Sequence, residues 1–235
     1  MKYLKFGDSK KYLVFLHGWG ADKNSFLWLK NQYKEYSIIF VDFAGFGETP
    51  EPSRPYSVYD YVSELKELLD NFYIESLVLI GHSFGGRVAI KFSFLFQNDY
   101  HYFKLCLVDS AGIKPKRNLS YYYKIYKYKF LKHYFPKSKK LFNYGSSDYK
   151  KLSKIMKQTL VKVVNEDLSN YAKFITVKTL IIWGENDKET KLYMAKKLNK
   201  LIKNSSLVII KDTGHFSFIE KPYEFIFNLD MFLRN

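Results

Sequence analysis

The sequence predicts an α/β fold, in which a mostly parallel central sheet is covered by helices on both faces. Two patterns support this prediction: short apolar runs recur along the chain, and segments with a helical spacing of apolar residues fill most of the gaps. The length of 235 residues and the 47% share of hydrophobic residues fit one compact, enzyme-sized core. The six runs that we expect to be strands are residues 12–17, 37–42, 76–81, 104–109, 177–183 and 206–211.

Each expected strand is short and apolar, and polar or glycine-containing turns bound it. The clearest expected helix covers residues 56–73, where apolar residues recur at helical spacing and the acidic residues fall on the remaining surface. Residues 87–96, 192–202 and 223–233 show the same spacing. Helices that alternate with strands in this order favour parallel strand pairing.

One region breaks the alternation, because more than sixty residues without a strand pattern separate Asp109 from Val177. An insertion of this length is too long for a simple loop in a compact domain. We therefore predict a helical lid, or cap, over residues 113–170, inserted into a core of residues 1–112 and 171–235.

The most informative motif is Gly81-His82-Ser83-Phe84-Gly85-Gly86, which directly follows an apolar run. A G-x-S-x-G pattern between a strand and a helix is typical of a nucleophile elbow, a sharp turn that projects the serine hydroxyl above the sheet. In such a turn a side chain at Gly81 or Gly85 would collide with neighbouring backbone. Because the pattern also occurs by chance, a catalytic interpretation requires a base, an acid and an oxyanion hole elsewhere.

Candidate partners follow in the order serine, aspartate, histidine, each on a turn after an expected strand. Gly184-Glu185-Asn186-Asp187 follows the fifth strand and makes Asp187 the candidate acid. His215 lies after the sixth strand and is the candidate base. The first strand ends in the glycine-rich turn His17-Gly18-Trp19-Gly20, whose backbone N–H groups can face a developing negative charge.

These motifs, in this order, resemble those of the α/β-hydrolase superfamily over nearly the whole chain. The residues that carry the resemblance are 17–20, 42–47, the elbow around Ser83, 184–187 and 214–216. The resemblance implies that Ser83, Asp187 and His215 form a catalytic triad, and that residues 42–47 shape a loop beside it. Only eleven residues precede Tyr12, so we expect the first two strands of the family to be abbreviated.

The chemistry of a neutral hydroxyl then predicts the roles of these residues. His215 accepts the serine proton as Ser83 attacks a carbonyl carbon, and Asp187 fixes the imidazole tautomer. The backbone amides of Trp19 and Phe84 are the expected oxyanion hole, and a water molecule releases the acid product. This mechanism needs no cofactor, and no spacing of histidines and carboxylates suggests a metal site.

Other residues compete for parts of this assignment. Asp109 ends the strand after the elbow and is an alternative acid; its other expected role is to cap the turn that follows it. We favour Asp187, because its turn matches the usual position of the acid. His17 and His82 are expected to brace turns, and Arg87 to be a buried partner in an ion pair.

Three classes of function remain open. The first is a serine hydrolase of carboxylic esters, including acyl thioesters and methyl esters of acyl chains on acyl carrier protein; a serine at 83 excludes the dehalogenase variant, which needs an aspartate there. The second is a carbon–carbon bond hydrolase or a menaquinone-pathway lyase, which use the same triad. The third is a non-catalytic binding module, which the intact triad disfavours.

The expected lid is strongly basic. Residues 113–162 contain fifteen basic residues, eight tyrosines and one acid, Asp148, which leaves 23 basic and 22 acidic residues for the rest of the chain. A lysine-rich codon bias does not explain why the core is neutral. The alternative is attraction of an anionic partner: an acidic carrier protein, a substrate carboxylate or phosphate, or a negatively charged membrane surface. Nucleic acid is disfavoured, because no binding motif accompanies the charge and only four of 38 basic residues are arginines.

The sequence also predicts a cytoplasmic protein. Its first residues lack the apolar core of a secretory signal, and no later run reaches the length of a transmembrane segment. Cys106 is the single cysteine and lies in an apolar run, so we expect it to act as a small buried hydrophobe rather than in a disulfide.

Overall fold

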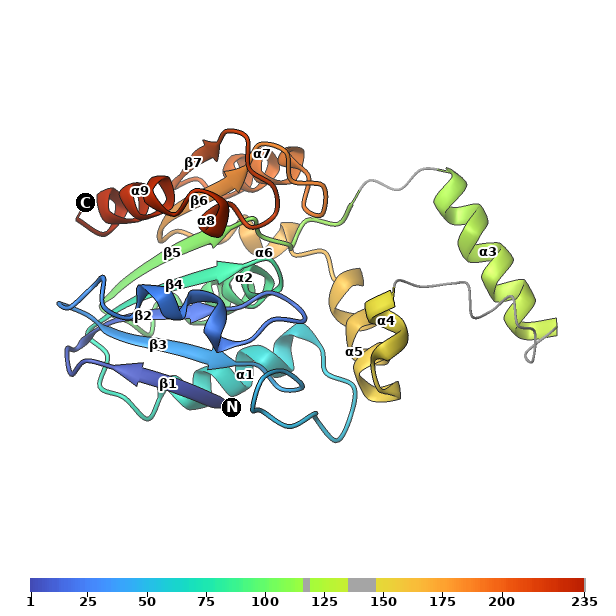
Figure 1. Cartoon of the computed structure of the whole chain (residues 1–235), viewed down its shortest axis with the longest axis horizontal. Coiled ribbons are helices and arrows are strands. Elements are labelled where there is room, and N and C mark those ends of the chain that lie inside the picture. Colours follow the sequence, from blue (N-terminus) through green and yellow to red (C-terminus); the bar gives the residue numbers. More distant parts are fainter. Residues whose placement is uncertain (116–118, 135–146, 235) are drawn as a thin grey trace.

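The computed structural model describes residues 1–115, 119–134 and 147–234, and in this part of the chain seven strands form one sheet (Figure 1). The strand order is β1-β3-β2-β4-β5-β6-β7, with β1 antiparallel to β3 and the other neighbours parallel. The α/β class is therefore confirmed, and the six predicted strands lie within two residues of their expected bounds. The strands are β1 (Lys2–Phe6), β2 (Lys11–Leu16), β3 (Ser37–Asp42), β4 (Ser76–His82), β5 (Tyr102–Val108), β6 (Lys178–Gly184) and β7 (Ser205–Ile210).

The stretch before Tyr12, where abbreviated strands are expected, holds the short strand β1, whose bounds were not predicted; the short 3-10 helix η1 (Lys23–Leu29) was not predicted either. Lysines interrupt the apolar pattern of β1, which is an edge strand: within the described ranges it pairs with β3 alone, and all five of its side chains are partly or fully exposed. Helix η1 begins after Asp22, whose side chain accepts a hydrogen bond from the Asn24 amide at 2.8 Å. Its seven residues are too few to show helical periodicity.

Helices cover both faces of the sheet. On one face, α1 (Val58–Leu69), α2 (Phe84–Phe96) and α7 (Leu192–Leu201) pack against alternate strand residues. On the other face, η1, α8 (Ser217–Glu220) and α9 (Pro222–Arg234) do the same. All four predicted helices are present; α2 begins at Phe84 rather than Arg87, because the elbow leads directly into it. Cys106 is fully buried in β5, as expected.

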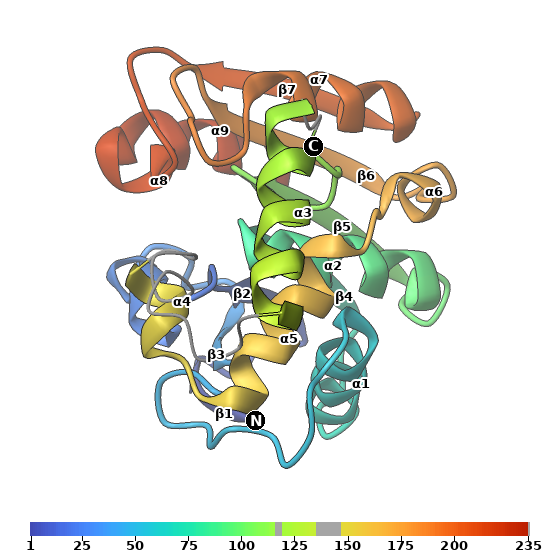
Figure 2. The same ribbon diagram turned by 90° about the vertical axis from the view of Figure 1, so that its right-hand side faces the viewer.

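The chain between β5 and β6 forms helices in the region where the lid is predicted. They are α3 (Leu119–Tyr134), α4 (Ser147–Lys151), α5 (Lys154–Asn165) and α6 (Ser169–Ala172). Parts of the predicted lid, residues 116–118 and 135–146, lie outside the described residues. Figure 1 shows α3 apart from the body, on the side toward which β4 and β5 point, and Figure 2 shows it crossing in front of that side.

None of the helices in the described ranges is long and apolar enough to cross a membrane. The cytoplasmic location stays a prediction.

Candidate active site

Ser83 occupies a strained turn between β4 and α2. Its φ of 50° and ψ of −110° lie outside the regions that a side chain-bearing residue normally adopts. The backbone of the turn is fixed by hydrogen bonds, since the Ser83 amide donates to the Val108 carbonyl at 3.1 Å and the Ser83 carbonyl accepts from the Ala111 amide at 3.0 Å. A Cβ atom on Gly81 would lie 2.6 Å from the Gly85 carbonyl oxygen, so this crossing requires glycine. The expected sharp turn is present.

The structure brings Ser83, His215 and Asp187 into one chain of hydrogen bonds. His215 Nε2 lies 2.9 Å from Ser83 Oγ, and His215 Nδ1 lies 2.8 Å from Asp187 Oδ2. The three side chains come from the turns after β4, β7 and β6, which end at the same edge of the parallel sheet. Asp187 is buried, whereas Ser83 and His215 are partly exposed and can be reached from solvent.

Asp187 is held by the turn that carries it. Its Oδ1 accepts hydrogen bonds from the amides of Glu189 at 2.8 Å and Thr190 at 2.9 Å, and its Oδ2 lies 2.6 Å from Thr190 Oγ1. Burial raises the pKa of Asp187, but the hydrogen bonds from His215 and Thr190 outweigh burial, and the net shift is downward. The carboxylate is therefore ionised at neutral pH. Thr190 was not identified in the sequence, because no motif marks it.

The ionised carboxylate sets the state of His215. An aspartate without a proton only accepts hydrogen bonds, so the proton of neutral His215 sits on Nδ1 and Nε2 is open to the Ser83 hydroxyl. Burial lowers the pKa of His215, but the hydrogen bond and charge of Asp187 outweigh burial and raise it above the ordinary value. This arrangement can take a proton from Ser83 and stabilise the resulting imidazolium.

Asp109, the alternative acid, takes a different place. Its Oδ1 accepts from the Gly184 amide at 2.7 Å, and its Oδ2 accepts from the amide of Ser217 at 3.2 Å and from the Ser217 hydroxyl at 2.6 Å. Asp109 thus ties the end of β6 to the start of α8, and the expectation that it caps its own turn is wrong. Burial raises the pKa of Asp109 to about 7. The carboxylate in hydrogen-bond contact with the His215 ring belongs to Asp187.

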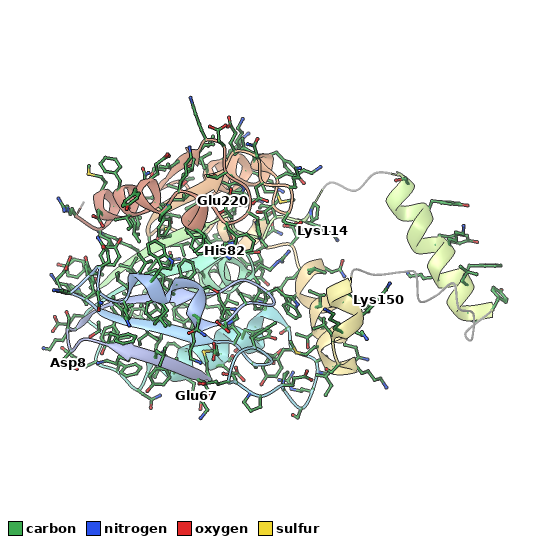
Figure 3. All side chains as sticks on the ribbon, viewed as in Figure 1. Asp8, Glu67, His82, Lys114, Lys150 and Glu220 are labelled. Carbon is green, nitrogen blue, oxygen red and sulfur yellow. The ribbon has the colours of Figure 1, made fainter. Side chains whose placement is uncertain are left out.

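Two further histidines brace the turns around the serine, as expected. His17 Nε2 accepts from the Phe43 amide at 3.1 Å, and its Nδ1 donates to the Gly18 carbonyl at 2.7 Å. His82 lies inside the body (Figure 3), and its Nε2 donates to the His215 carbonyl at 2.8 Å. Burial lowers the pKa of both rings, that of His82 to about 3, so both are neutral. Neutral buried rings with these partners act as supports rather than as proton carriers.

The candidate oxyanion donors flank the serine. A Cβ atom on Gly18 would lie 3.4 Å from Ser83 Cβ, so the turn that contains Trp19 runs beside the nucleophile. The Trp19 ring packs edge-on against Phe84, with 5.3 Å between ring centroids. Within the described part of the chain, neither the Trp19 nor the Phe84 amide donates to a protein acceptor. These two N–H groups are therefore open to a ligand.

The loop of residues 42–47 is held by Asp42 and lies beside the site. The buried Asp42 carboxylate accepts from the Lys23 amide and ammonium, both at 2.7 Å, and from the Glu48 amide at 2.9 Å. Gly47 has a φ of +55°, and any Cβ there would overlap this carboxylate. The loop contacts the insertion, because a Cβ on Gly45 would lie 2.5 Å from Met156 Cε.

Helix α5 is anchored beside the elbow by residues of α2. Arg87 donates to the carbonyls of Glu166 at 2.8 Å and Val164 at 3.5 Å, so it caps the end of α5. The ion pair expected of Arg87 is instead made by Lys91, whose Nζ lies 2.5 Å from Glu166 Oε1. Burial lowers the pKa of Arg87 to about 10, and the guanidinium remains charged at neutral pH.

A mostly parallel sheet with a strained serine elbow, an acid after β6 and a histidine after β7 defines an α/β-hydrolase-fold protein. The model of the alpha/beta hydrolase family matches residues 13–229, and the chain belongs to this family. It is 29% identical over 234 residues to Lipase 1 of Psychrobacter immobilis, covering 88% of this chain and 72% of that protein.

Two other similarities cover nearly the whole chain. Pimeloyl-[acyl-carrier protein] methyl ester esterase of Wigglesworthia glossinidia brevipalpis is 26% identical over 260 residues, covering 97% of this chain and 95% of that protein. The solved structure of an esterase, EaEST, from Exiguobacterium antarcticum superimposes with a TM-score of 0.78 at 24% identity, covering 99% of this chain and 95% of that one. The structural likeness shows that the two chains share a fold.

Proposed function

We propose that the protein is a serine hydrolase that cleaves carboxylic esters through an acyl-enzyme on Ser83. The observation that carries the proposal is the chain of hydrogen bonds from Ser83 Oγ through His215 to Asp187. The similarity to a lipase and to a methyl ester esterase supports an ester as the bond that is cleaved.

In the first half of the reaction, Ser83 Oγ attacks the acyl carbon while its proton moves to His215 Nε2. The carbonyl oxygen becomes an oxyanion, which we assign to the amides of Trp19 and Phe84. The tetrahedral adduct then expels the alcohol, whose oxygen takes the proton from His215 Nε2. Asp187 stabilises the imidazolium between these two transfers.

In the second half, His215 Nε2 takes a proton from water as the water oxygen attacks the acyl carbon on Ser83. The oxyanion again accepts from the two amides, and the bond between Ser83 Oγ and the acyl carbon breaks. Ser83 Oγ recovers its proton from His215, and the free acid leaves. Apart from the ester and one water molecule, these steps use only groups of this chain.

We assign residues 1–112 and 171–235 to the catalytic core and residues 113–170 to a lid. Contacts of the α5 segment support this division, since Glu166 bonds to Arg87 and Lys91 of α2, and Met156 packs against Gly45. The lid then contributes to the acyl pocket.

Labelling with a fluorophosphonate, which reacts with activated serines, tests the proposal. We expect the unmodified protein to be labelled and Ser83→Ala to be unlabelled. Ser93→Ala is the matched control, because it removes a buried hydroxyl of α2 that has no hydrogen-bond partner among the residues the structure describes, and it should keep the label. Absence of labelling in the unmodified protein would favour a binding module, and labelling of Ser83→Ala would show that the wrong nucleophile was chosen.

A substrate panel tests which bond is cleaved. We expect turnover of p-nitrophenyl esters, with a preferred length between acetyl and decanoyl that reports the depth of the acyl pocket. The similarity to the Wigglesworthia esterase is a reason to include methyl esters of acyl chains on acyl carrier protein, and acyl thioesters belong in the same panel. Turnover of vinylogous diketones alone would replace ester hydrolysis by carbon–carbon bond cleavage.

A further inference from the structure

Helix α3 carries a stripe of exposed aromatic side chains. Tyr123, Tyr126, Phe130 and Tyr134 are 65%, 69%, 45% and 62% exposed. Their spacings of three, four and four residues place them on one face of a helix with about 3.6 residues per turn. We call these four residues the aromatic stripe. Such a contiguous row of rings on a surface marks a site of interaction.

Basic side chains border the stripe on both sides. Lys127 lies along one border, and Lys129 and His133 lie along the other, because each residue turns the helix by about 100°. Both lysines are exposed, and within the described residues neither forms an ion pair. Among the side chains of α3 that the structure describes, an exposed aromatic stripe is therefore bordered by basic residues.

The charges around α3 limit which surfaces could bind the aromatic stripe. Exposed Lys114 and Lys150 lie on the flank of the body nearest α3 (Figure 3), and the exposed carboxylate of Glu51 accepts a hydrogen bond from Ser153 beside α4. Closing α3 onto this flank would bring its lysines toward Lys114 and Lys150. A second copy of a chain with a net charge of +15 would meet the same repulsion.

An anionic lipid surface can bind both the aromatic stripe and the lysines beside it. Tyrosine and phenylalanine rings partition to the headgroup region of a bilayer, where the tyrosine hydroxyl stays hydrated. Lysines beside them attract anionic headgroups, and each contributes to binding on its own. An acidic protein would complement the lysines, but its solvated surface would leave the row of rings without an apolar environment.

We propose that α3 docks on the surface of an anionic lipid bilayer, with the aromatic stripe at headgroup level and Lys127 and Lys129 against lipid phosphates. Because α3 lies on the side toward which β4 points, docking turns the Ser83 edge of the sheet toward the membrane (Figure 1, Figure 2). The proposal concerns binding and does not depend on the hydrolase assignment.

Sedimentation of the full chain with vesicles tests the docking. The protein carries Ser83→Ala so that no lipid is consumed, and the vesicles are phosphatidylcholine alone or mixed in equal parts with phosphatidylglycerol. We expect binding to the mixed vesicles, a loss of about fivefold in affinity for each of Lys127→Gln and Lys129→Gln, and a comparable or larger loss for Tyr126→Ser with Phe130→Ser.

The matched control lies on α9, where Tyr223 and Phe227 are 87% and 65% exposed. Tyr223→Ser with Phe227→Ser should leave vesicle binding unchanged, because α9 covers the far part of the body. Absence of binding to mixed vesicles would overturn the proposal, and so would an equal loss in the control. Binding of acyl carrier protein that needs the α3 lysines, without any vesicle binding, would assign the surface to a protein partner instead.

A second measurement separates docking through the stripe from general attraction of a cationic protein. A tryptophan placed by Phe130→Trp should be quenched by brominated lipid in mixed vesicles more strongly than one placed by Phe227→Trp, with the unsubstituted protein as the background. Equal quenching at the two positions would show that α3 does not face the bilayer. Hydrolysis of a soluble ester, measured separately on protein with Ser83 intact, distinguishes failure of this proposal from failure of the proposed function.

Discussion

The edge of the sheet around Ser83 and helix α3 differ in the burial and hydrogen bonding of their side chains. Around Ser83, the polar side chains of Asp187, Asp109 and His82 are buried and hydrogen-bonded to named partners. Helix α5 belongs with this region, because Met156, Thr159 and Val163 are buried beside the core. On α3, the aromatic stripe and its lysines are exposed.

This contrast indicates that the two halves of the insertion have different roles. The second half is fixed to the core by the Arg87 cap, the Lys91 ion pair and a hydrogen bond from the Tyr56 amide to Thr159 Oγ1 at 3.0 Å. In the first half, Ile113 is buried in the core and Leu131 is partly buried, whereas the aromatic stripe of α3 is exposed. A substitution in the fixed region should therefore affect catalysis or the stability of the fold, whereas a substitution on α3 should affect only binding to other molecules or surfaces.

The largest expected effect is on catalysis, where the two regions should differ most. Asp187→Asn should lower kcat on a small neutral ester by roughly 10⁴-fold, because an amide can donate to Nδ1 and favour the wrong imidazole tautomer. Lys127→Gln with Lys129→Gln should leave kcat on that ester unchanged, because these charges are exposed and distant from the bond that breaks. Steady-state kinetics measures both.

Asp109→Asn is the control for the choice of acid. It should lower kcat far less than Asp187→Asn, because Asp109 contacts Gly184 and Ser217 rather than the His215 ring. A loss for Asp109→Asn as large as that for Asp187→Asn, at equal thermal stability, would contradict the assignment of the acid.

A smaller difference between the two regions is expected in the stability of the fold. Met156→Ala should lower the free energy of unfolding by about 2–5 kcal/mol, because it empties a buried site against Gly45. Phe130→Ala on α3 should change it by no more than about 0.5 kcal/mol, because that ring is exposed. Urea denaturation at one pH compares the two. Equal losses would mean that the stripe packs against the body and is not an open surface.

The smallest expected effect is on pH dependence. His215 must be neutral to act as a base, and its pKa is raised above 6.5, so kcat/KM should fall as the pH decreases through a midpoint above 6.5. Asp187→Asn should move the midpoint of any residual activity to lower pH, because the raising hydrogen bond and charge are lost. The α3 lysine variants should leave the midpoint in place, and a clear shift in them would show that α3 charges reach the site.

Much of the fold was predictable because it depends on local patterns. Apolar runs located six strands, helical spacing located four helices, and glycines around Ser83 located the strained turn. The bounds of strand β1 were not predicted, because an edge strand has no need of a continuous apolar run. Thr190 was not identified, because a single threonine carries no periodic or motif signal. Its importance comes from two contacts with the Asp187 carboxylate.

The roles of several polar residues also required the structure. Asp109 and Arg87 were recognised as buried candidates, but their partners, Ser217 and Glu166, lie 108 and 79 residues away in the sequence. Spacing along the chain cannot give such pairs, because they depend on which loops meet at the edge of the sheet.

The sequence by itself determined the α/β class, the place of the serine turn and the identity of the candidate acid and base, because strand periodicity, glycine geometry and motif order are properties of the chain. Only the tertiary structure decided that Asp187, not Asp109, contacts His215, and that one half of the insertion is anchored while the aromatic stripe of α3 is exposed. The physical reason is that hydrogen-bond partners and burial are set by the packing of distant segments, whereas secondary structure follows largely from neighbouring residues.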